Sequence, residues 1–182
     1  LFDTPSTPVT LAGPGSVLVD TTVTGTQGLR VERSARIDGL QAPNSPVPVS
    51  MAGGASGTVL RRVSAPTGAR FDVPNGALAG AISWTNTQFP YRITPGNNLA
   101  DQRQVRGTFR IYPGVRVEVD PVASLAVQPG ATMNIGGTAQ APVNFDGIGA
   151  STWRGLTVAV GGSLNVSHAT IAGLSSSVDV LG

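Results

Sequence analysis

The sequence contains no cysteine and no lysine, and it has a single histidine among 182 residues. Without cysteine, disulfide bonds, thiolate metal ligands and a thiol nucleophile are all excluded. All twelve basic residues are arginines, and ten acidic residues bring the net charge to only +2. A charge so close to zero does not create the one-signed field that nucleic-acid-binding proteins use, so we expect no nucleic-acid partner.

Long apolar runs are also missing. The longest are about five residues, whereas a membrane-spanning helix needs about 20, so we predict no transmembrane span. The hydrophobic fraction of 40% is nevertheless typical of a packed interior, and the length suits one domain over residues 1–182. The chain starts at Leu1 and its first ten residues do not resemble a signal peptide, so we expect it to be part of a longer polypeptide.

Short segments with alternating apolar and polar residues occur along the whole chain, for example around Phe109 and Ile111. This alternation places apolar side chains on one side of a strand and polar ones on the other. Gly, Pro, Asn and Ser separate the segments at turn-like spacing. The pattern predicts an all-β protein, in which residues 98–106 are the best candidate for a short helix or a polar excursion.

Residues 108–135 repeat themselves when shifted by sixteen positions, so that Phe109 matches Leu125 and Gly114 matches Gly130. A β-sandwich would need hairpins, yet Asn-Gly occurs once and Asp-Gly twice. Stacked turns of a β-solenoid explain the repetition better than hairpins do, and we expect residues sixteen apart to stack on each other.

One segment, residues 124–173, has a more detailed pattern: a Pro-Gly corner, a Gly-Thr step, "PV.F" and then "W.GL". It resembles the right-handed parallel β-helix domains of bacterial surface and secreted proteins, the pectin-lyase-like superfamily in the broad sense. The resemblance is best over residues 105–173. It implies a single right-handed parallel β-helix of about seven to nine turns with roughly 20 to 25 residues each, and an extracellular or cell-surface location. The matching positions are Gly130, Gly137, Thr138, Pro142, Val143, Phe145, Trp153, Gly155 and Leu156.

Enzymes of that architecture cut polysaccharides with carboxylate pairs, or with an arginine base beside calcium-binding aspartates. Glu118 and Asp120 are the best candidates for a catalytic pair, because residues two apart in a strand lie on one side at about 7 Å. They also precede Pro121 at a strand end, where solvent-facing acids are common, and this interpretation is favoured. The other acids are scattered and His168 has no carboxylate neighbour in sequence, so we predict no metal site, no cofactor and no catalytic histidine.

Six of the twelve arginines lie between residues 30 and 70, where stacked turns would bring them together into a patch for an anionic ligand or partner. The competing interpretation pairs them with Glu32, Asp38 and Asp72. Similarly, Trp84, Tyr91, Tyr112 and Trp153 would either line a sugar-binding face or, as we favour, pack at corners. The proposed patch consists of Arg30, Arg33, Arg36, Arg61 and Arg62, with Arg70 nearby.

These observations favour a non-catalytic structural or binding module of an exported or cell-surface protein that contributes to envelope assembly or adhesion. The alternative is a polysaccharide lyase or glycoside hydrolase acting on acidic polysaccharide. A β-helix also leaves unpaired strand edges at its ends. We therefore expect other subunits, or further parts of the same chain, to cover those ends, with polysaccharide as a further partner.

Overall fold

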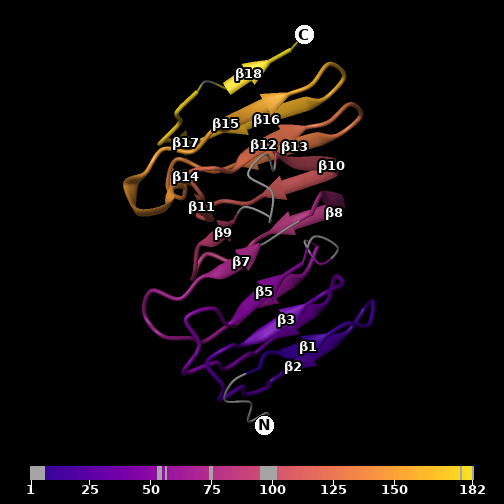
Figure 1. The fold of residues 1–182 in the computed structure, drawn as a ribbon, viewed down its shortest axis with the longest axis vertical. Helices are drawn as coiled ribbons and strands as arrows, with labels where there is room; N and C mark the ends of the chain where they lie inside the picture. The colour runs from indigo at the N-terminus through magenta and orange to yellow at the C-terminus, as the bar shows by residue number, and fades with distance from the viewer. Residues whose placement is uncertain are drawn as a thin grey trace.

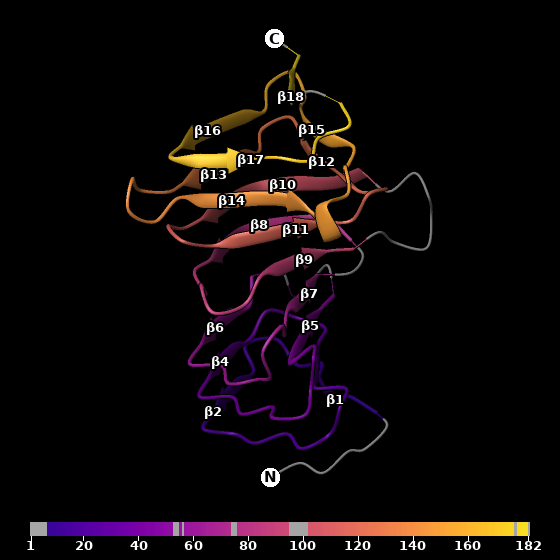
Figure 2. The ribbon, with the colours of Figure 1, turned by 90° about the vertical axis from the view of Figure 1, so that its left-hand side faces the viewer.

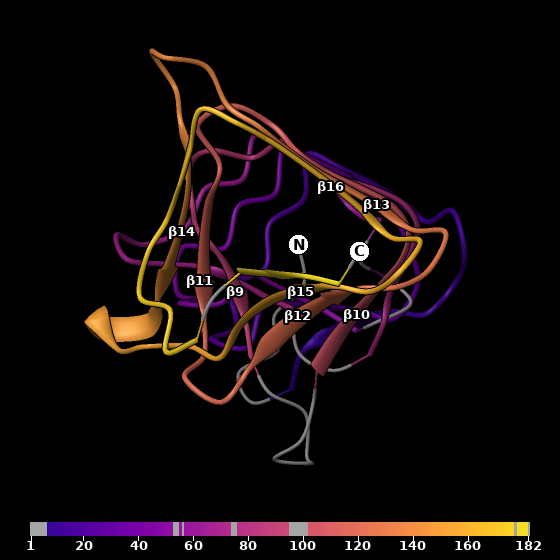
Figure 3. The same cartoon turned by 90° about the horizontal axis from the view of Figure 1, so that it is seen from above.

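The computed structural model describes residues 7–52, 55, 57–73, 76–94, 102–176 and 178–181. Its strands are short, parallel and stacked along one axis, with the N-terminus at one end and the C-terminus at the other (Figure 1). Viewed along that axis, the turns superpose as a triangle with three flat faces (Figure 3). A short 3-10 helix spans Ile148–Ala150. The predicted all-β parallel β-helix, folded as one domain, is confirmed.

The first face of the triangle is an eight-stranded parallel sheet that runs the whole length of the molecule. Each of its strands belongs to a different turn, so the chain completes seven turns between the first strand and the last. In order, the strands are β1 (Val9–Leu11), β3 (Leu29–Val31), β5 (Val49–Met51), β7 (Phe71–Val73), β9 (Tyr91–Ile93), β11 (Arg116–Val119), β14 (Val143–Gly147) and β17 (Ala169–Ile171).

The other two faces share one long strand, β10 (Gln102–Ile111). Its first part pairs with the second face, which continues through β12 (Ser124–Val127), β15 (Gly155–Val158) and β18 (Val178–Val180). Its last part pairs with the third face, formed by β13 (Thr132–Gly136), β16 (Ser163–Ser167) and β8 (Leu78–Trp84). Below β8 the third face continues as the sheet β2 (Val17–Val19), β4 (Arg36–Asp38) and β6 (Val59–Arg61) (Figure 2).

The bend between the two parts of β10 lies at Gly107, which has φ +120°. Gly107 pairs with Gly80 of the turn below, and a Cβ on Gly107 would lie 2.5 Å from the Gly80 carbonyl oxygen. Only glycine combines this backbone conformation with such a close approach. The expected helix over residues 98–106 is wrong for 102–106, which belong to β10, while 98–101 lie outside the described residues.

Turn length differs between the two ends of the molecule. Val9 pairs with Leu29, twenty residues on, whereas Val117 pairs with Phe145, twenty-eight residues on. The upper turns are longer than the expected 20 to 25 residues because loops project from their corners, as the orange loop between β13 and β14 does in Figure 3.

Residues sixteen apart do not stack, contrary to our expectation. Phe109 pairs with Met133 of the next turn, twenty-four residues on, and Leu125 pairs with Leu156. The last part of β10 lies on the third face, β11 on the first and β12 on the second. A shift of sixteen residues therefore moves from one face to the next but one within a turn. The repeat therefore reflects the similar strand-and-corner sequence of successive faces.

The core fills the inside of the triangle with apolar side chains from all three faces. Trp84 stacks on Tyr91 with ring centroids 4.3 Å apart and a 3° interplanar angle, and it meets Phe109 edge to face at 4.7 Å. Higher in the molecule the rings of Phe145 and Trp153 lie 6.4 Å apart with an interplanar angle of 27°. This continuous interior leaves the outward side chains of the three faces as the surface on which a functional site must lie.

Candidate functional site

The two carboxylates predicted as a possible catalytic pair lie on and just after β11 of the first face. Glu118 Oε2 accepts two hydrogen bonds from Arg92, from Nε at 2.9 Å and from Nη2 at 2.7 Å. Asp120 Oδ1 accepts a hydrogen bond from the Val122 backbone N–H at 3.2 Å. Both carboxylates therefore stabilise local structure. Glu118 joins two turns, and Asp120 closes the corner after β11.

Glu118 belongs to a column of outward side chains on the first face. Parallel pairing places Arg30, Ser50, Asp72, Arg92 and Glu118 one above another in successive turns. Opposite charges alternate from Asp72 through Arg92 to Glu118, an arrangement that favours pairing between neighbouring strands. Asp146, the next residue up, repeats the negative charge of Glu118. The column is therefore a ladder of ionic and polar contacts along the axis of the molecule.

Asp72 lies in the middle of this ladder and is half-buried. Its Oδ1 accepts a hydrogen bond from Arg70 Nε at 3.0 Å. Burial raises the pKa of Asp72 above its usual value, and the nearby guanidinium of Arg70 only partly opposes this effect. Burial disfavours the charged carboxylate more strongly here than the arginines favour it.

A groove of about 380 Å³ opens beside Glu118 at the corner of two stacked turns. Arg116 extends along it, with Nη2 at 3.4 Å from the Gln88 carbonyl oxygen. The groove combines a guanidinium, a carboxylate and an apolar ring, the set of groups that binds a polar organic molecule. Its lining includes Gly68, Gln88, Phe89, Pro90, Arg116 and Glu118.

The five arginines predicted as a patch are divided among the first face, one turn and the third face. Arg30 is on the first face, where it pairs with Glu32 at 3.4 Å. Arg33 is exposed in the turn between β3 and β4. The remaining three, Arg36, Arg61 and Arg62, lie on or beside the third face. The ion pairs of Arg30, Arg36, Arg62 and Arg70 with aspartate or glutamate match the competing interpretation of paired, solvated ladders.

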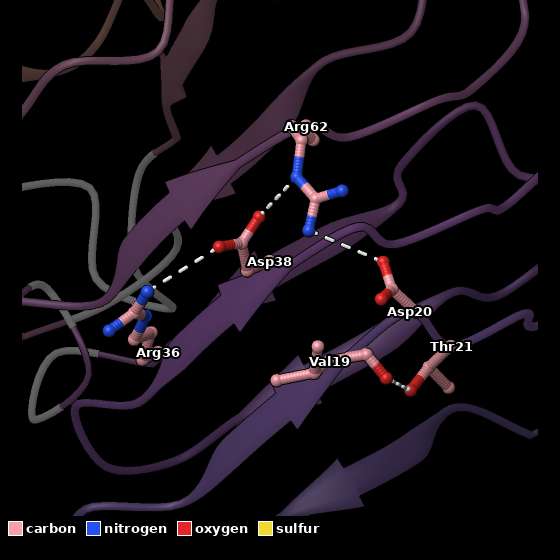
Figure 4. A network of polar contacts seen from close by, with 6 residues as sticks. All are labelled: Val19, Asp20, Thr21, Arg36, Asp38 and Arg62. Carbon is pink, nitrogen blue, oxygen red and sulfur yellow. Dashed lines mark hydrogen bonds and ion pairs between the residues drawn. The ribbon is translucent and has the colours of Figure 1, made fainter.

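On the third face, Asp38 connects two of these arginines (Figure 4). Its Oδ1 accepts from Arg62 Nε at 2.7 Å, and its Oδ2 accepts from Arg36 Nη2 at 3.5 Å. Arg62 also reaches Asp20 Oδ1 at 3.3 Å, so the network joins three successive turns. The hydrogen bond from Arg62 is the main reason that the pKa of Asp38 lies below its usual value.

The corner of this network has an unusual backbone. Asp20 and Arg62 each follow a strand of the third face and have φ of +43° and +45°. The equivalent position in the turn between them is Gly39, also with positive φ. The ion pairs thus stabilise a stack of corners at which the backbone has positive φ. This backbone conformation is costly for residues other than glycine.

His168 is exposed between β16 and β17, at a third such corner with φ +45°. Among the aromatic candidates, Trp84, Tyr91 and Trp153 are buried in the core, and Trp153 Nε1 donates to the Ala172 carbonyl oxygen at 2.8 Å. Tyr112 alone of the four is exposed, at 42%. Three of the four aromatic residues therefore pack inside the solenoid, as we favoured from the sequence.

Sequence reasoning missed two arginines with specific contacts. Arg92 pairs with Glu118 of the next turn, twenty-six residues on. This pair can be predicted from the sequence only if the length of the turn between them is known. Arg103 on β10 is 4% exposed, and its guanidinium donates to the backbone carbonyls of Gly76 and Thr94. It ties β10 to the start of β8 and the end of β9, at the level where the turns widen.

Comparison with known proteins gives no match among family models, curated proteins or solved structures. In the described part of the chain, no helix is long and apolar enough to span a membrane. The same residues contain no group of three or more His, Asp or Glu side chains placed to hold a metal ion.

Proposed function

We propose that this chain is a non-catalytic β-helix module that serves as a rigid scaffold or binding surface of an exported or cell-surface protein, with a role in envelope assembly or adhesion. The observation that carries the proposal is the Arg92–Glu118 pair. It uses the best candidate for a catalytic carboxylate to join two turns of the solenoid. The location outside the cell rests on the sequence resemblance of residues 124–173.

A rigid rod is what the packing supports. Stacked aromatic rings, an apolar interior shared by all turns and charge ladders on two faces resist bending along the axis. In a solenoid each turn contacts mainly its neighbours, and the stack offers long flat faces to partners. Such a shape suits a spacer or a platform for binding.

The groove beside Glu118 favours a second candidate function, cleavage of an acidic polysaccharide. Arg116 in that groove offers a guanidinium to a uronate carboxylate, and Glu118 is the carboxylate in its lining, with Asp120 two residues on. For this chemistry Glu118 would have to exchange Arg92 for the substrate. In the structure the Arg92 guanidinium already occupies Glu118 Oε2 through two hydrogen bonds.

The two functions are separated by incubating the chain with polygalacturonate and with alginate, and following new reducing ends and unsaturated products. The scaffold proposal predicts no release above a protein-free blank. Release that disappears in Glu118→Gln and Asp120→Asn, with circular dichroism unchanged, would establish the enzyme instead. Glu32→Gln is the matched control, because Glu32 is also a glutamate paired with an arginine but lies away from the groove.

A further inference from the structure

The upper part of the third face carries almost no charge. It is formed by β8, the last part of β10, β13 and β16, which pair in successive turns (Figure 1). Arg110 is the only charged residue in these four stretches, and their outward side chains are otherwise hydroxyls, amides and small groups. In the described part of the chain no ion pair involves Arg110. These strands therefore supply one positive charge and no carboxylate to neutralise it.

Polar side chains are aligned along the centre of this part of the face. Arg110 pairs with Asn134, and Asn134 pairs with Asn165, so a guanidinium and two amides follow one another in successive turns. Asn165 Nδ2 donates to Asn134 Oδ1 at 2.9 Å, and among the described residues this is the only side-chain hydrogen bond of either amide. Each amide has two N–H donors and an oxygen acceptor. Donors and acceptors of both therefore remain available to a ligand.

Tyr112 supplies an aromatic ring beside this row of polar groups, and it is 42% exposed. It directly follows Ile111, which pairs with Ile135, so its neighbour on the next strand is Gly136. Gly136 in turn pairs with Ser167. Because glycine has no side chain and serine has a short one, the two strands above Tyr112 leave room next to the ring.

Two adjoining hollows occupy this room. One of about 160 Å³ lies beside Arg110 and Tyr112, and one of about 280 Å³ lies beside Asn165 and Ser167. Both are also lined by Asn134 and Gly136, so they form one depression across three strands. Its polar side chains point away from the core, so the depression does not depend on what adjoins the last turn. We call this surface the amide platform; it consists of Arg110, Tyr112, Asn134, Gly136, Asn165 and Ser167.

A glycan that carries acidic groups matches the chemistry of the amide platform. One side of a sugar ring presents C–H groups, which pack on an aromatic ring such as that of Tyr112. Sugar hydroxyls both donate and accept hydrogen bonds, as the amides of Asn134 and Asn165 do. The guanidinium of Arg110 suits a carboxylate or a sulfate, which it binds with two parallel hydrogen bonds. A protein partner would instead need an apolar centre in the contact, and the amide platform offers a single ring.

We propose that the amide platform binds an acidic glycan, with Arg110 on its carboxylate or sulfate group and Tyr112 against a sugar ring. Adjacent strands lie about 4.8 Å apart, so three strands span about 10 Å, the length of two linked sugar rings. This site rests on the proposed function, because it presupposes that the module is a binding surface. It is separate from the groove beside Glu118, with which it shares no residue, and it cleaves no bond.

The test is isothermal titration calorimetry of the chain with three oligosaccharide probes. Oligogalacturonate carries carboxylates, a dextran sulfate oligosaccharide carries sulfates, and the dextran oligosaccharide of the same length is the neutral control. We expect at least one acidic probe to bind, and dextran to bind more weakly by about tenfold or more, because it lacks the charged partner of Arg110. Binding of only one acidic probe would identify the group that Arg110 recognises, and either result supports the proposal.

Substitutions locate the site on the molecule. Arg110→Gln should weaken binding of the acidic probe by about tenfold or more, because charged hydrogen bonds are lost. Arg33→Gln is the matched control, since Arg33 is also exposed and loses the same charge but lies in the turn between β3 and β4. Tyr112→Ala and Gly136→Leu should weaken binding by a similar factor, the first by removing the ring and the second by filling the hollow. Position 136 accepts a side chain, because the nearest atom beyond its chain neighbours, the Ile111 carbonyl oxygen, would lie 3.8 Å from a Cβ.

If neither acidic probe binds, the proposal is wrong and the scaffold function stands. Equal binding of dextran, or equal losses in Arg33→Gln and Arg110→Gln, would also overturn it, because the attraction would then be unspecific. Release of shortened products would contradict the proposed function instead, and the losses in Arg110→Gln and Tyr112→Ala would still decide this site.

Nuclear magnetic resonance of the wild type gives a readout that needs no variant. The side-chain amide signals of Asn134 and Asn165 should shift when the acidic probe is added. The signals of Asn44, whose amide donates to the Thr24 carbonyl oxygen in the lower part of the molecule, should not. Shifts confined to residues outside the amide platform would overturn the proposal.

Discussion

Gly28 offers a sensitive test of how closely the turns are stacked. It precedes β3 with φ +62°, and a Cβ at this position would lie 2.3 Å from the Val47 carbonyl oxygen and 2.7 Å from that of Pro48. Both oxygens belong to the next turn. Gly28→Ala must therefore push two turns apart, in addition to straining its own backbone.

Gly15 is the matched control, because it has nearly the same conformation, φ +68°, and no atom lies within 4 Å of the place that a Cβ would occupy. Gly15→Ala should cost only the left-handed conformation, about 1–2 kcal/mol. Gly28→Ala adds the cost of forcing an atom into a packed site, about 1–3 kcal/mol.

For a chain of this size about 1 kcal/mol shifts Tm by about 2–4 °C, so the two variants should differ in Tm by about 2–12 °C. Thermal unfolding followed by circular dichroism, with urea unfolding as a check, measures the difference. Equal destabilisation by the two substitutions would show that the turn above Gly28 does not lie where the structure places it.

Further predictions concern the charge ladders and the aromatic residues. Because the pKa of Asp38 is lowered in the folded state, its stabilising effect is present above pH 3.8 and is lost as pH falls through the lowered value, so Asp38→Asn should destabilise at pH 7 and less at pH 3. The pKa of Asp72 is raised instead, so Asp72→Asn should increase the free energy of unfolding at pH 7, and this increase should disappear below pH 3.8. Urea unfolding at several pH values measures the effect of each substitution. If both substitutions changed the free energy of unfolding in the same direction at pH 7, the environments described for Asp38 and Asp72 would be contradicted. Trp84→Ala should lower the free energy of unfolding by about 3–5 kcal/mol, because Trp84 lies in the aromatic stack. Tyr112→Ala on the surface should change it by less than about 0.5 kcal/mol. Similar losses for the two variants in unfolding experiments would refute this distinction.

The architecture could be predicted from the sequence because strands and corners are local features. Alternation around Phe109 and Ile111 identifies a strand, and Gly114 in the corner that follows marks its end. The number of residues that separates stacked positions could not be predicted from the sequence repeat. Since the three faces of one turn have similar sequences, a shift by two faces matched as well as a shift by a whole turn, and only the paired strands distinguish them.

The same limit applies to the charged residues. Pairs two apart in one strand, such as Arg36 with Asp38 and Arg70 with Asp72, follow from the alternation alone, because such residues lie on one side of the strand. The pair of Arg92 with Glu118 joins different turns, so it requires the turn length as well. For that reason the sequence suggested Glu118 as a catalytic acid and did not reveal the arginine that binds it.

Cysteine crosslinking tests the stacking of the turns most directly, because the chain has no cysteine of its own. Thr108 pairs with Thr132 of the next turn, whereas Ser124, sixteen residues from Thr108, lies on another face. Adjacent parallel strands lie about 4.8 Å apart, within the Cα separation of about 4.4–6.8 Å that a disulfide spans. Mild oxidation should therefore crosslink the Thr108→Cys, Thr132→Cys variant within one chain and leave the Thr108→Cys, Ser124→Cys variant reduced. A crosslink in the second variant and none in the first would contradict the solenoid described here.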